Sequence, residues 1–370
     1  MAVLTGCDSP PSTYEVIKAK ELKSGASNHD AHLAALAPYR EEILQKLPAE
    51  KYATNDLIIP PAQAFRVPEW TEWADLKIKI HLPRTQEMFG PWIVAQVSGY
   101  FEMAGLRVKI IPSEPSEDYY ATLQHEIVDA FIEPTGTRLI QAVANGMDMT
   151  AVQSLYQKNP NVITTIDTAT PTDQISNATF TPEIFSQQIV GIDSNHTYFA
   201  GVTRDRWGVE PLNVRYVGFR VPNPFFIFEN RVIFCETEIG ATSAFFEIRK
   251  VRNWVHIPVD DYLSPQANWL TVVNNSLLNE NPDVIKRYNW ALFRAILDFF
   301  ERPDEIKLTI RDAIEQKRHP SYIKLAWEAR IPYIKGDGQK PLLSINKDAL
   351  NWNAATLLQQ GLLEVNETNE

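Results

Sequence analysis

The feature that most constrains the fold is a regular alternation of short strands and amphipathic helices that begins at Leu76. The segment LKIKIHL (76–82) alternates apolar and polar residues like a strand, and FGPWIVAQVSGYFEMAG (89–105) is typical of a helix that ends at Gly105. Such an alternation predicts a mainly parallel sheet covered by helices, an α/β architecture. The first unit continues with strands at 106–111, 128–134 and 149–157 and helices at 118–126 and 136–146.

The alternation restarts after a polar loop, which predicts a second unit of the same kind. An extended run at 161–167 precedes the loop, and the strand QQIVGI (187–192) reopens the pattern. The unit continues with helices at 195–208 and 241–250 and strands at 213–219, 231–235 and 254–259. No internal sequence repeat accompanies the two units.

Helices are expected to complete the chain. After an extended run at 269–278, the segment 281–300 is amphipathic, and its apolar face carries Val284, Tyr288, Leu292 and Ile296. Further helices are expected near 303–316, 320–329 and 346–361, and helical spacing at 29–47 lies in a proline-rich lead-in over residues 8–75.

Composition excludes several classes of function. The formal net charge of the 370-residue chain is −11, which argues against nucleic acid and anionic lipid as main partners. No apolar stretch reaches the ~18 residues of a membrane helix, and two cysteines supply neither a disulfide framework nor a cysteine-based zinc site. Glycine motifs for phosphate, dinucleotide or nucleophile-elbow sites are absent, so no cofactor, metal or catalytic residue is expected.

From Leu76 to about Pro303 the chain resembles one family of bacterial solute-binding proteins. The stretches that carry the resemblance are FGPWIVAQVSGYFEMAGLRVKII, VDAFIEPTGTRLIQAVANGMDMTAVQSLYQKNPNVI, QQIVGIDSNHTYFAGVTRDRWGV and NNSLLNENPDVIKRYNWALFRAILDFF. The family serves ABC importers for sulfonates, nitrate, thiamine pyrimidine precursors and riboflavin, and the fungal thiamine-pyrimidine synthases share its fold.

The resemblance implies a two-lobed fold of the periplasmic-binding-protein type II class. In such a fold the lobes close by a hinge motion over a small-molecule ligand, and ABC permease subunits are the protein partners. We expect a lead-in at 1–75, a first lobe at 76–160 plus 268–370 and a second lobe at 161–267. Segments near 158–168 and 258–270 would connect the lobes.

In open parallel sheets, ligands bind beyond the carboxyl ends of strands and at helix N-termini, which selects the loops of the first lobe. In PRTQEMFGPW (83–92), Arg84 could bind an anionic group, and Gln86 and Glu87 could bind amide or amino edges of a ring. Phe89 and Trp92 could stack on that ring. The alternative interpretation makes Arg84 a surface charge and Trp92 a core residue.

Two further positions of the first lobe are candidates for ligand contact. Glu133 and Thr135 belong to the loop IEPTGT (132–137), where Thr135 could instead cap the following helix. Tyr156 ends the next expected strand, and core packing is as strongly expected for it as ligand contact.

The second lobe offers candidates that follow strands or lie in a connecting segment. For Asn195, helix capping is as strongly expected as ligand binding. For Asp261, a solvated hinge is favoured over ligand binding. The candidates are Asn195, His196, Tyr198, Glu236, Thr237 and Asp261.

A cleft of this composition is acidic and aromatic with one arginine. It favours a flat, hydrogen-bonding heterocycle, of thiamine-precursor or riboflavin type, over a simple anion. The alternatives are a sulfonate- or nitrate-type binder, a ligand-free accessory subunit of a membrane complex and, less favoured, a pyrimidine-synthesis enzyme. The synthases use a cysteine cluster, whereas this chain has only Cys7 and Cys235. The accessory alternative gains support from FCETEIGATSAFFEIRK (234–250), which lacks the Tyr-Asn-Glu element that related binding proteins often carry there.

The segment LTGC (4–7) matches the pattern at which lipoprotein signal peptides are cut and the cysteine is acylated. A Pro/Ser-rich tether follows and would keep the folded body free of the membrane surface. We therefore expect a lipid anchor on Cys7 and a location in the periplasm or at the outer face of the cytoplasmic membrane. Only six residues precede Cys7, so the hypothesis requires a signal segment that these six residues do not supply.

Overall fold

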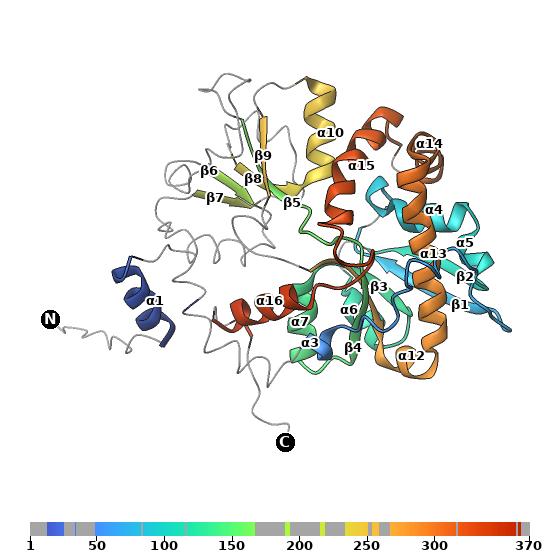
Figure 1. Cartoon of the computed structure of the whole chain (residues 1–370), viewed down its shortest axis with the longest axis horizontal. Coiled ribbons are helices and arrows are strands. Elements are labelled where there is room, and N and C mark those ends of the chain that lie inside the picture. The colour runs from blue at the N-terminus through green and yellow to red at the C-terminus, as the bar shows by residue number, and fades with distance from the viewer. Residues whose placement is uncertain are drawn as a thin grey trace.

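The computed structural model contains two five-stranded sheets with helices packed around them (Figure 1). It describes residues 13–25, 34, 49–82, 84–114, 117–166, 189–192, 215–218, 234–250, 254–258, 267–315, 317–359 and 362–363. No helix within these ranges is both long enough and apolar enough to cross a membrane.

The first sheet has the strand order β2-β1-β3-β10-β4. β1 is parallel to both β2 and β3, whereas β10 is antiparallel to β3 and to β4. Its strands are β1 (Ala74–Ile80), β2 (Leu106–Pro112), β3 (Ala130–Thr135), β4 (Met149–Ser154) and β10 (Asn268–Asn274).

The second sheet has the order β7-β6-β8-β5-β9 and repeats the same pattern of directions. β6 is parallel to β7 and β8, and β5 is antiparallel to β8 and β9. Its strands are β5 (Asn161–Ile166), β6 (Ile189–Ile192), β7 (Arg215–Gly218), β8 (Phe234–Glu238) and β9 (Trp254–Pro258).

The chain passes between the sheets twice within the described order of strands. It leaves the first sheet after β4, builds all five strands of the second, and returns as β10 to fill a central place of the first. In each sheet four strands run in one direction and a single strand runs against them, so the predicted mainly parallel, two-lobed α/β architecture is confirmed. We call the parts built on the first and second sheets the first and second lobes.

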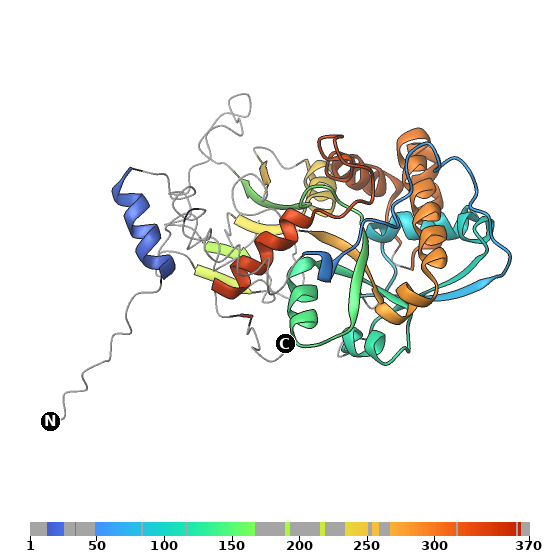
Figure 2. The same ribbon diagram turned by 60° about the horizontal axis from the view of Figure 1, so that its bottom comes forward.

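Helices cover both faces of the first sheet. Figures 1 and 2 show α16 beside α7 and α3, while α13 packs with α4 and α5 on the opposite side. The helices are α1 (Thr13–Lys23), α3 (Ala49–Tyr52), η1 (Glu87–Phe89), α4 (Gly90–Val97), α5 (Tyr100–Met103), α6 (Tyr119–Gln124), α7 (Gly136–Ala144), α10 (Ile239–Arg249), α12 (Asn275–Glu280), α13 (Pro282–Glu301), α14 (Pro303–Ala313), α15 (Pro320–Lys335) and α16 (Lys347–Gln359).

The long helix α13 forms as its sequence pattern predicts, and its apolar face closes the larger core. Val284, Tyr288, Leu292 and Ile296 are all buried against α4, α5 and the sheet. The helix begins at Pro282, which suits the first turn because proline lacks the N–H that would be unpaired there.

Three boundaries differ from the predicted ones. The helix expected at 89–105 is divided into α4 and α5 because Gly99 adopts a left-handed backbone (φ +73°) that an α-helix does not contain, and the short η1 precedes α4. The run expected to be extended over 269–278 turns helical at Asn275, where the side chain of Asn274 accepts a hydrogen bond from the backbone N–H of Ser276. The helix expected at 320–329 continues to Lys335 despite Pro332. The helices expected at 29–47, apart from residue 34, and at 195–208 lie outside the described residues.

Tyr288 offers a test of this core. Its hydroxyl accepts a hydrogen bond from Nε1 of Trp92 (2.6 Å) and lies 3.1 Å from the hydroxyl of Thr271, and all three side chains are buried. Tyr288→Phe keeps the ring but leaves the Trp92 N–H without its acceptor. We expect urea unfolding to show a loss of about 1–3 kcal/mol in the free energy of unfolding. A loss within the error of the measurement would contradict this assignment of the hydrogen bond.

Candidate functional site

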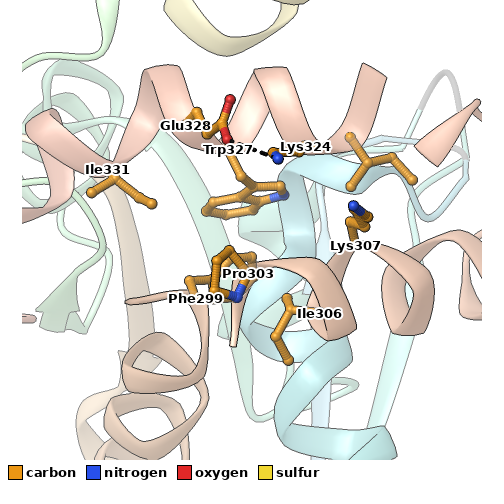
Figure 3. A pocket seen from close by; sticks show the side chains of 9 residues that line it. Phe299, Pro303, Ile306, Lys307, Lys324, Trp327, Glu328 and Ile331 are labelled. Carbon is orange, nitrogen blue, oxygen red and sulfur yellow. Dashed lines mark ion pairs between the residues drawn. The ribbon is translucent and has the colours of Figure 1, made fainter. Parts of the chain in front are cut away.

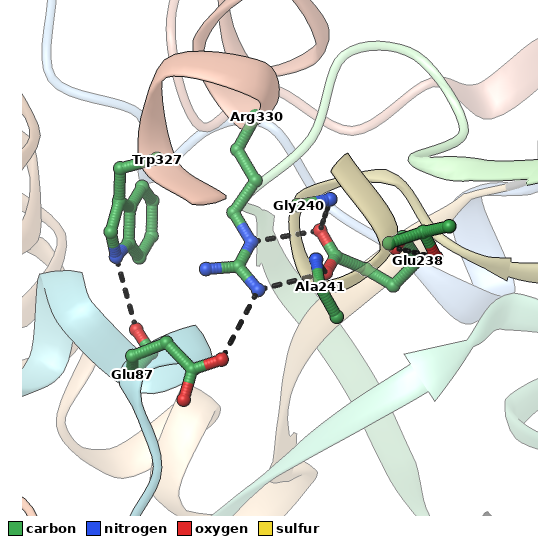
Figure 4. A network of polar contacts seen from close by, with 7 residues as sticks. Glu87, Glu238, Gly240, Ala241, Trp327 and Arg330 are labelled. Carbon is green, nitrogen blue, oxygen red and sulfur yellow. Dashed lines mark hydrogen bonds and ion pairs between the residues drawn. The ribbon is translucent and has the colours of Figure 1, made fainter. Parts of the chain in front are cut away.

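The candidate site is centred on Arg330, a fully buried residue of α15. Its Nε and Nη2 donate hydrogen bonds to Oε1 and Oε2 of Glu238, each at 2.8 Å. Its Nη2 also lies 3.9 Å from Oε1 of Glu87. Arg330 therefore lies between a carboxylate of the first lobe and a carboxylate of the second (Figure 4), and its contact with Glu238 is the bidentate type that fixes a guanidinium most strongly.

Glu238 reaches this position because it joins the end of β8 to the start of α10. Its carboxylate accepts hydrogen bonds from the backbone N–H groups of Gly240 (3.1 Å) and Ala241 (3.0 Å), so it caps α10 while it binds Arg330. The positive end of the helix dipole and the guanidinium both attract the negative charge of this carboxylate.

Glu87 lies in η1, which follows the loop after β1. Its backbone carbonyl accepts a hydrogen bond from Nε1 of Trp327 (3.1 Å), and the ring of Trp327 lies 5.0 Å from the guanidinium of Arg330. This arrangement gives the cation an aromatic face in addition to its two carboxylates.

The environment of Arg330 keeps it charged. Burial alone lowers its pKa, but the attraction and hydrogen bonds of Glu238 outweigh burial and raise the pKa above its ordinary value. With two carboxylates around one guanidinium, the centre has a formal charge of −1.

Two buried polar atoms of this centre have no hydrogen-bond partner: Oε2 of Glu87 and Nη1 of Arg330. The hydroxyl of Tyr156 lies beside Glu238 and Arg330. Burial raises the pKa of Tyr156, and the negative charge of Glu238 raises it further, so the hydroxyl keeps its proton. Because buried polar groups are normally paired, the two unpaired atoms of Glu87 and Arg330 mark a place with unused hydrogen-bonding capacity.

Aromatic rings line the side of the first lobe next to this centre. The ring of Trp269 lies 5.3 Å from that of Phe89 and 6.1 Å from that of Tyr156, and His81 contacts both Trp269 and Phe89 edge to face. Trp269 also has a left-handed backbone (φ +55°), which is rare for a bulky residue and often marks functional sites.

The other candidates of the first loop have different positions. Arg84 is exposed and Gln86 is half-buried. Phe89 and Trp92 are fully buried, and the only polar atom of Trp92 is used by Tyr288. The structure thus brings Glu87, Phe89 and Tyr156 to the surroundings of Arg330 and Trp269.

Glu133 forms a separate buried cluster. Its carboxylate accepts hydrogen bonds from the hydroxyls of Tyr119 (3.1 Å) and Tyr120 (2.5 Å) and from the N–H of Thr135 (2.9 Å). Burial raises the pKa of Glu133 although these hydrogen bonds act to lower it. Thr135 precedes α7 without a capping hydrogen bond from its side chain.

Several candidates cannot be placed at this site. Glu236 and Thr237 belong to β8, where they pair with Ile163 and Val162 of β5. The candidates Asn195, His196, Tyr198 and Asp261, and the acylation candidate Cys7, lie outside the described residues. Within the described ranges, no group of three or more His, Cys, Asp or Glu side chains is arranged to hold a metal ion.

Two helix N-termini around the site already use backbone N–H groups. Glu238 caps α10, and the N–H of Gly136 at the start of α7 donates to the carbonyl of Ala267 (2.7 Å), whereas α4 has Pro91 in its first turn and no side-chain cap. A simple anion binds to free N–H groups at such termini, and the cap of α10 withdraws those of Gly240 and Ala241.

Sequence reasoning missed Arg330, Glu238, His81 and Trp269. One signal for Arg330 was present: Ile323, Trp327, Arg330 and Ile334 follow helical spacing, and all four are buried. A charged residue within an apolar stripe indicates a buried partner, although it does not identify that partner.

A hollow lined by Trp327 lies between α13, α14 and α15 (Figure 3). Apolar side chains form its floor, and the exposed pair Lys324 and Glu328 lies at its rim with 3.7 Å between the charged atoms. Its main apolar lining residues are Phe299, Pro303, Ile306, Ile323, Trp327 and Ile331.

The pH dependence of stability tests the aromatic side of the site. Burial, followed by the positive charge of Arg138, lowers the pKa of His81 from 6.5 to about 4. As the pH falls below ~6.5, His81 gains a proton in the unfolded chain, whereas in the folded chain it gains one only near pH ~4. The free energy of unfolding therefore falls as the pH is lowered across this window. In urea unfolding, the free energy of unfolding of the wild type should fall when the pH is lowered from 7 to 4.5. We expect this fall to be about 2 kcal/mol smaller in His81→Gln.

The matched control for this test is His125→Gln, because His125 is exposed on the surface. The control should keep the full pH dependence of the wild type. Identical pH profiles for His81→Gln and the wild type would show that the His81 ring is not shielded as the structure describes.

Comparisons with known proteins agree with the fold. Residues 86–176 match the family model described as "NMT1/THI5 like", which covers about a quarter of the chain. No curated protein sequence matches at a significant level.

Solved structures are similar over most of the chain. The periplasmic aliphatic sulphonate binding protein SsuA from Escherichia coli has a TM-score of 0.56 and 10% identity, over 79% of this chain and 89% of its own. The alkanesulfonate-binding protein SsuA from Xanthomonas axonopodis pv. citri has a TM-score of 0.55 and 12% identity, over 80% and 96%.

A third similar structure is the Candida albicans CA3427 gene product, described as having the generic periplasmic binding protein fold, with a TM-score of 0.50 and 18% identity over 80% and 92%. The chain therefore has the two-lobed periplasmic-binding-protein fold, and its residues 86–176 carry the sequence pattern of the NMT1/THI5-like family.

Proposed function

We propose that the chain is the solute-binding protein of an ABC importer and binds a small molecule between its two lobes. The observation that carries the proposal is the convergence of Glu87, Tyr156, Glu238 and Arg330, from four distant parts of the chain, at the junction of the lobes. The unpartnered Oε2 of Glu87 offers an acceptor to a solute. Similar structures include two sulfonate-binding proteins and the ligand-binding component of an ABC-type import system from Staphylococcus aureus, and they support the same class.

We assign residues 76–160 and 268–370 to the first lobe and 161–267 to the second. The short connection between β4 and β5, at 155–160, and the connection before β10 would then form the hinge. Rotation about two connections opens and closes a cleft without disturbing either sheet. The proposed role is binding and delivery to a permease, and it includes no catalytic step.

We propose a flat heterocycle with amino or amide groups as the solute, of the thiamine-precursor or riboflavin type. The net negative centre attracts N–H donors, and Phe89, Tyr156 and Trp269 supply aromatic surface for a planar ring. The capped N-terminus of α10 argues against a sulfonate or nitrate at this centre, although two of the similar structures are sulfonate-binding proteins. The acidic surroundings would also repel an anionic solute directly.

Isothermal titration calorimetry with a panel of solutes tests this function. We expect heat from a thiamine pyrimidine precursor or riboflavin, and none from taurine or nitrate. Binding of taurine alone would replace the heterocycle with a sulfonate as the solute. The absence of binding by every member of the panel would contradict the solute-binding role as we propose it.

Glu87→Gln tests the position of the site. The change removes the negative charge beside the guanidinium and one of the unpartnered acceptors. We expect the affinity for the bound heterocycle to fall at least tenfold, which corresponds to about 1.4 kcal/mol. Glu328→Gln, an exposed glutamate of α15, is the matched control and should bind like the wild type. Equal affinities for the two variants would place the solute elsewhere.

A ligand-free accessory subunit of a membrane complex is the second candidate. The observation that favours it is the complete burial of Arg330 in the place between the lobes. Mass spectrometry of the purified protein separates the two candidates, because a solute-binding protein carries its tightly bound solute through purification. An empty protein that also ignores the titration panel would favour the accessory role.

We also propose that the mature protein is held at the membrane, on its periplasmic or outer face, by acyl chains on Cys7. The LTGC pattern and the tether after it support this location. Mass spectrometry of the N-terminal peptide from the native host should show Cys7 as the first residue with added acyl mass, and Cys7→Ser should release the protein from membranes. A peptide in which Gly6 still precedes an unmodified Cys7 would overturn the anchor.

A further inference from the structure

Helix α15 lies between the two lobes and contacts both. It packs against α10 of the second lobe along one side and against α14 on the other, and α14 in turn packs against α4 of the first lobe (Figure 1). On α15, Trp327 donates a hydrogen bond to the backbone carbonyl of Glu87, and Arg330 donates to the carboxylate of Glu238 (Figure 4). One helix therefore fastens a loop of the first lobe to a helix start of the second.

Two glycines permit this close approach, one at the first turn of a helix in each lobe. A Cβ on Gly240 would lie 2.5 Å from Nε of Arg330 and 2.7 Å from the carbonyl oxygen of Ala326. A Cβ on Gly90 would lie 2.5 Å from the ring of Trp327. Both positions face residues of α15, so both lobes are shaped to accept this helix.

The C-terminal end of α15 is hydrogen-bonded to the proposed hinge at 155–160. The carbonyl of Tyr333 accepts hydrogen bonds from the N–H groups of Gln157 (2.9 Å) and Lys158 (3.1 Å). The side chain of Gln157 is in turn bonded to Ser344 through both of its polar atoms. The connection at 155–160 is thus fixed by the segment that carries Arg330.

We propose that Arg330 is a tethered ligand, by which we mean a side chain of the protein itself that occupies the inter-lobe site and closes the lobes without a solute. The guanidinium is planar, cationic and rich in N–H donors, and the site gives it a bidentate carboxylate, a second carboxylate and an aromatic face. These are the contacts that would bind a planar nitrogen-containing solute.

A tethered group has an advantage over a free solute. Its effective concentration at the site is of millimolar order or higher, because the chain prevents its escape. A solute must therefore bind the open lobes strongly enough to displace Arg330, and removal of Arg330 should raise solute affinity. The proposal rests on the two-lobed fold and deepens the proposed function, since it assigns planar cations or N–H-rich rings to the same site.

Lobe separation can be measured without any solute by double electron–electron resonance. Spin labels would be attached at Lys286→Cys on α13 and Glu247→Cys on α10, which are exposed positions in different lobes, after Cys7 and Cys235 are changed to serine. We expect Arg330→Met to lengthen the mean distance by more than about 2 Å and to broaden its distribution. Glu238→Gln should act in the same direction, and it provides a second route if Arg330→Met fails to fold.

Lys324→Met is the matched control, because it removes an exposed charge from the same helix. Its distances should equal those of the wild type. Unchanged distances in both Arg330→Met and Glu238→Gln would overturn the tethered-ligand proposal.

Chemical rescue gives an independent readout. Arg330→Ala removes the guanidinium and leaves its two carboxylates and the ring of Trp327 in place, so added methylguanidinium should bind there and raise the thermal midpoint by about 2 °C or more. Tetramethylammonium at the same concentration should have no such effect, nor should methylguanidinium on Lys324→Ala. Equal effects of the two cations on Arg330→Ala would contradict a site built for a guanidinium.

These results are distinguishable from a failure of the proposed function. Opening of Arg330→Met with no binding of any solute by the wild type or the variant would support the tethered ligand and favour the accessory role. Solute binding by the wild type with no opening of the variants would leave the importer function standing and remove the tethered ligand.

Discussion

The structure depends on the burial of one positive charge. Arg330 is fully enclosed, and removal of a charge from water is costly unless partners replace the water completely. Glu238 provides two hydrogen bonds at 2.8 Å, and Glu87 provides a second negative charge. Because these glutamates belong to different lobes, Arg330 links the two lobes through its contacts.

The same requirement explains features that would otherwise be unrelated. Gly240 must lack a side chain so that Arg330 can reach its carboxylate, and Gly90 must lack one so that Trp327 can cover the guanidinium. Glu238 has two tasks, since it caps α10 and binds Arg330 with the same two oxygens. A substitution at any of these positions would act on the relation between the lobes as well as on local stability.

The sequence was informative where structure is decided locally. Strand–helix alternation predicted both sheets, and the apolar spacing of α13 predicted its buried face. The break at Gly99 was not predicted, because glycine within an apolar helical pattern does not reveal its φ angle. Glu87 was a candidate by its place after a strand, whereas Arg330 was missed because its burial depends on Glu238, 92 residues away. The helical spacing of α15 indicates that Arg330 is buried, but it does not identify the partner.

The central place of β10 has a consequence for synthesis of the chain. β10 lies between β3 and β4, and the contact of Ser154 with Asn268 joins residues 114 positions apart. A ribosome needs roughly 6–20 s to make that stretch. Until then the edges of β3 and β4 stay without their shared neighbour, as a template for unwanted strand pairing. The first sheet thus starts before the second but is completed after it, when about three quarters of these 370 residues have been made.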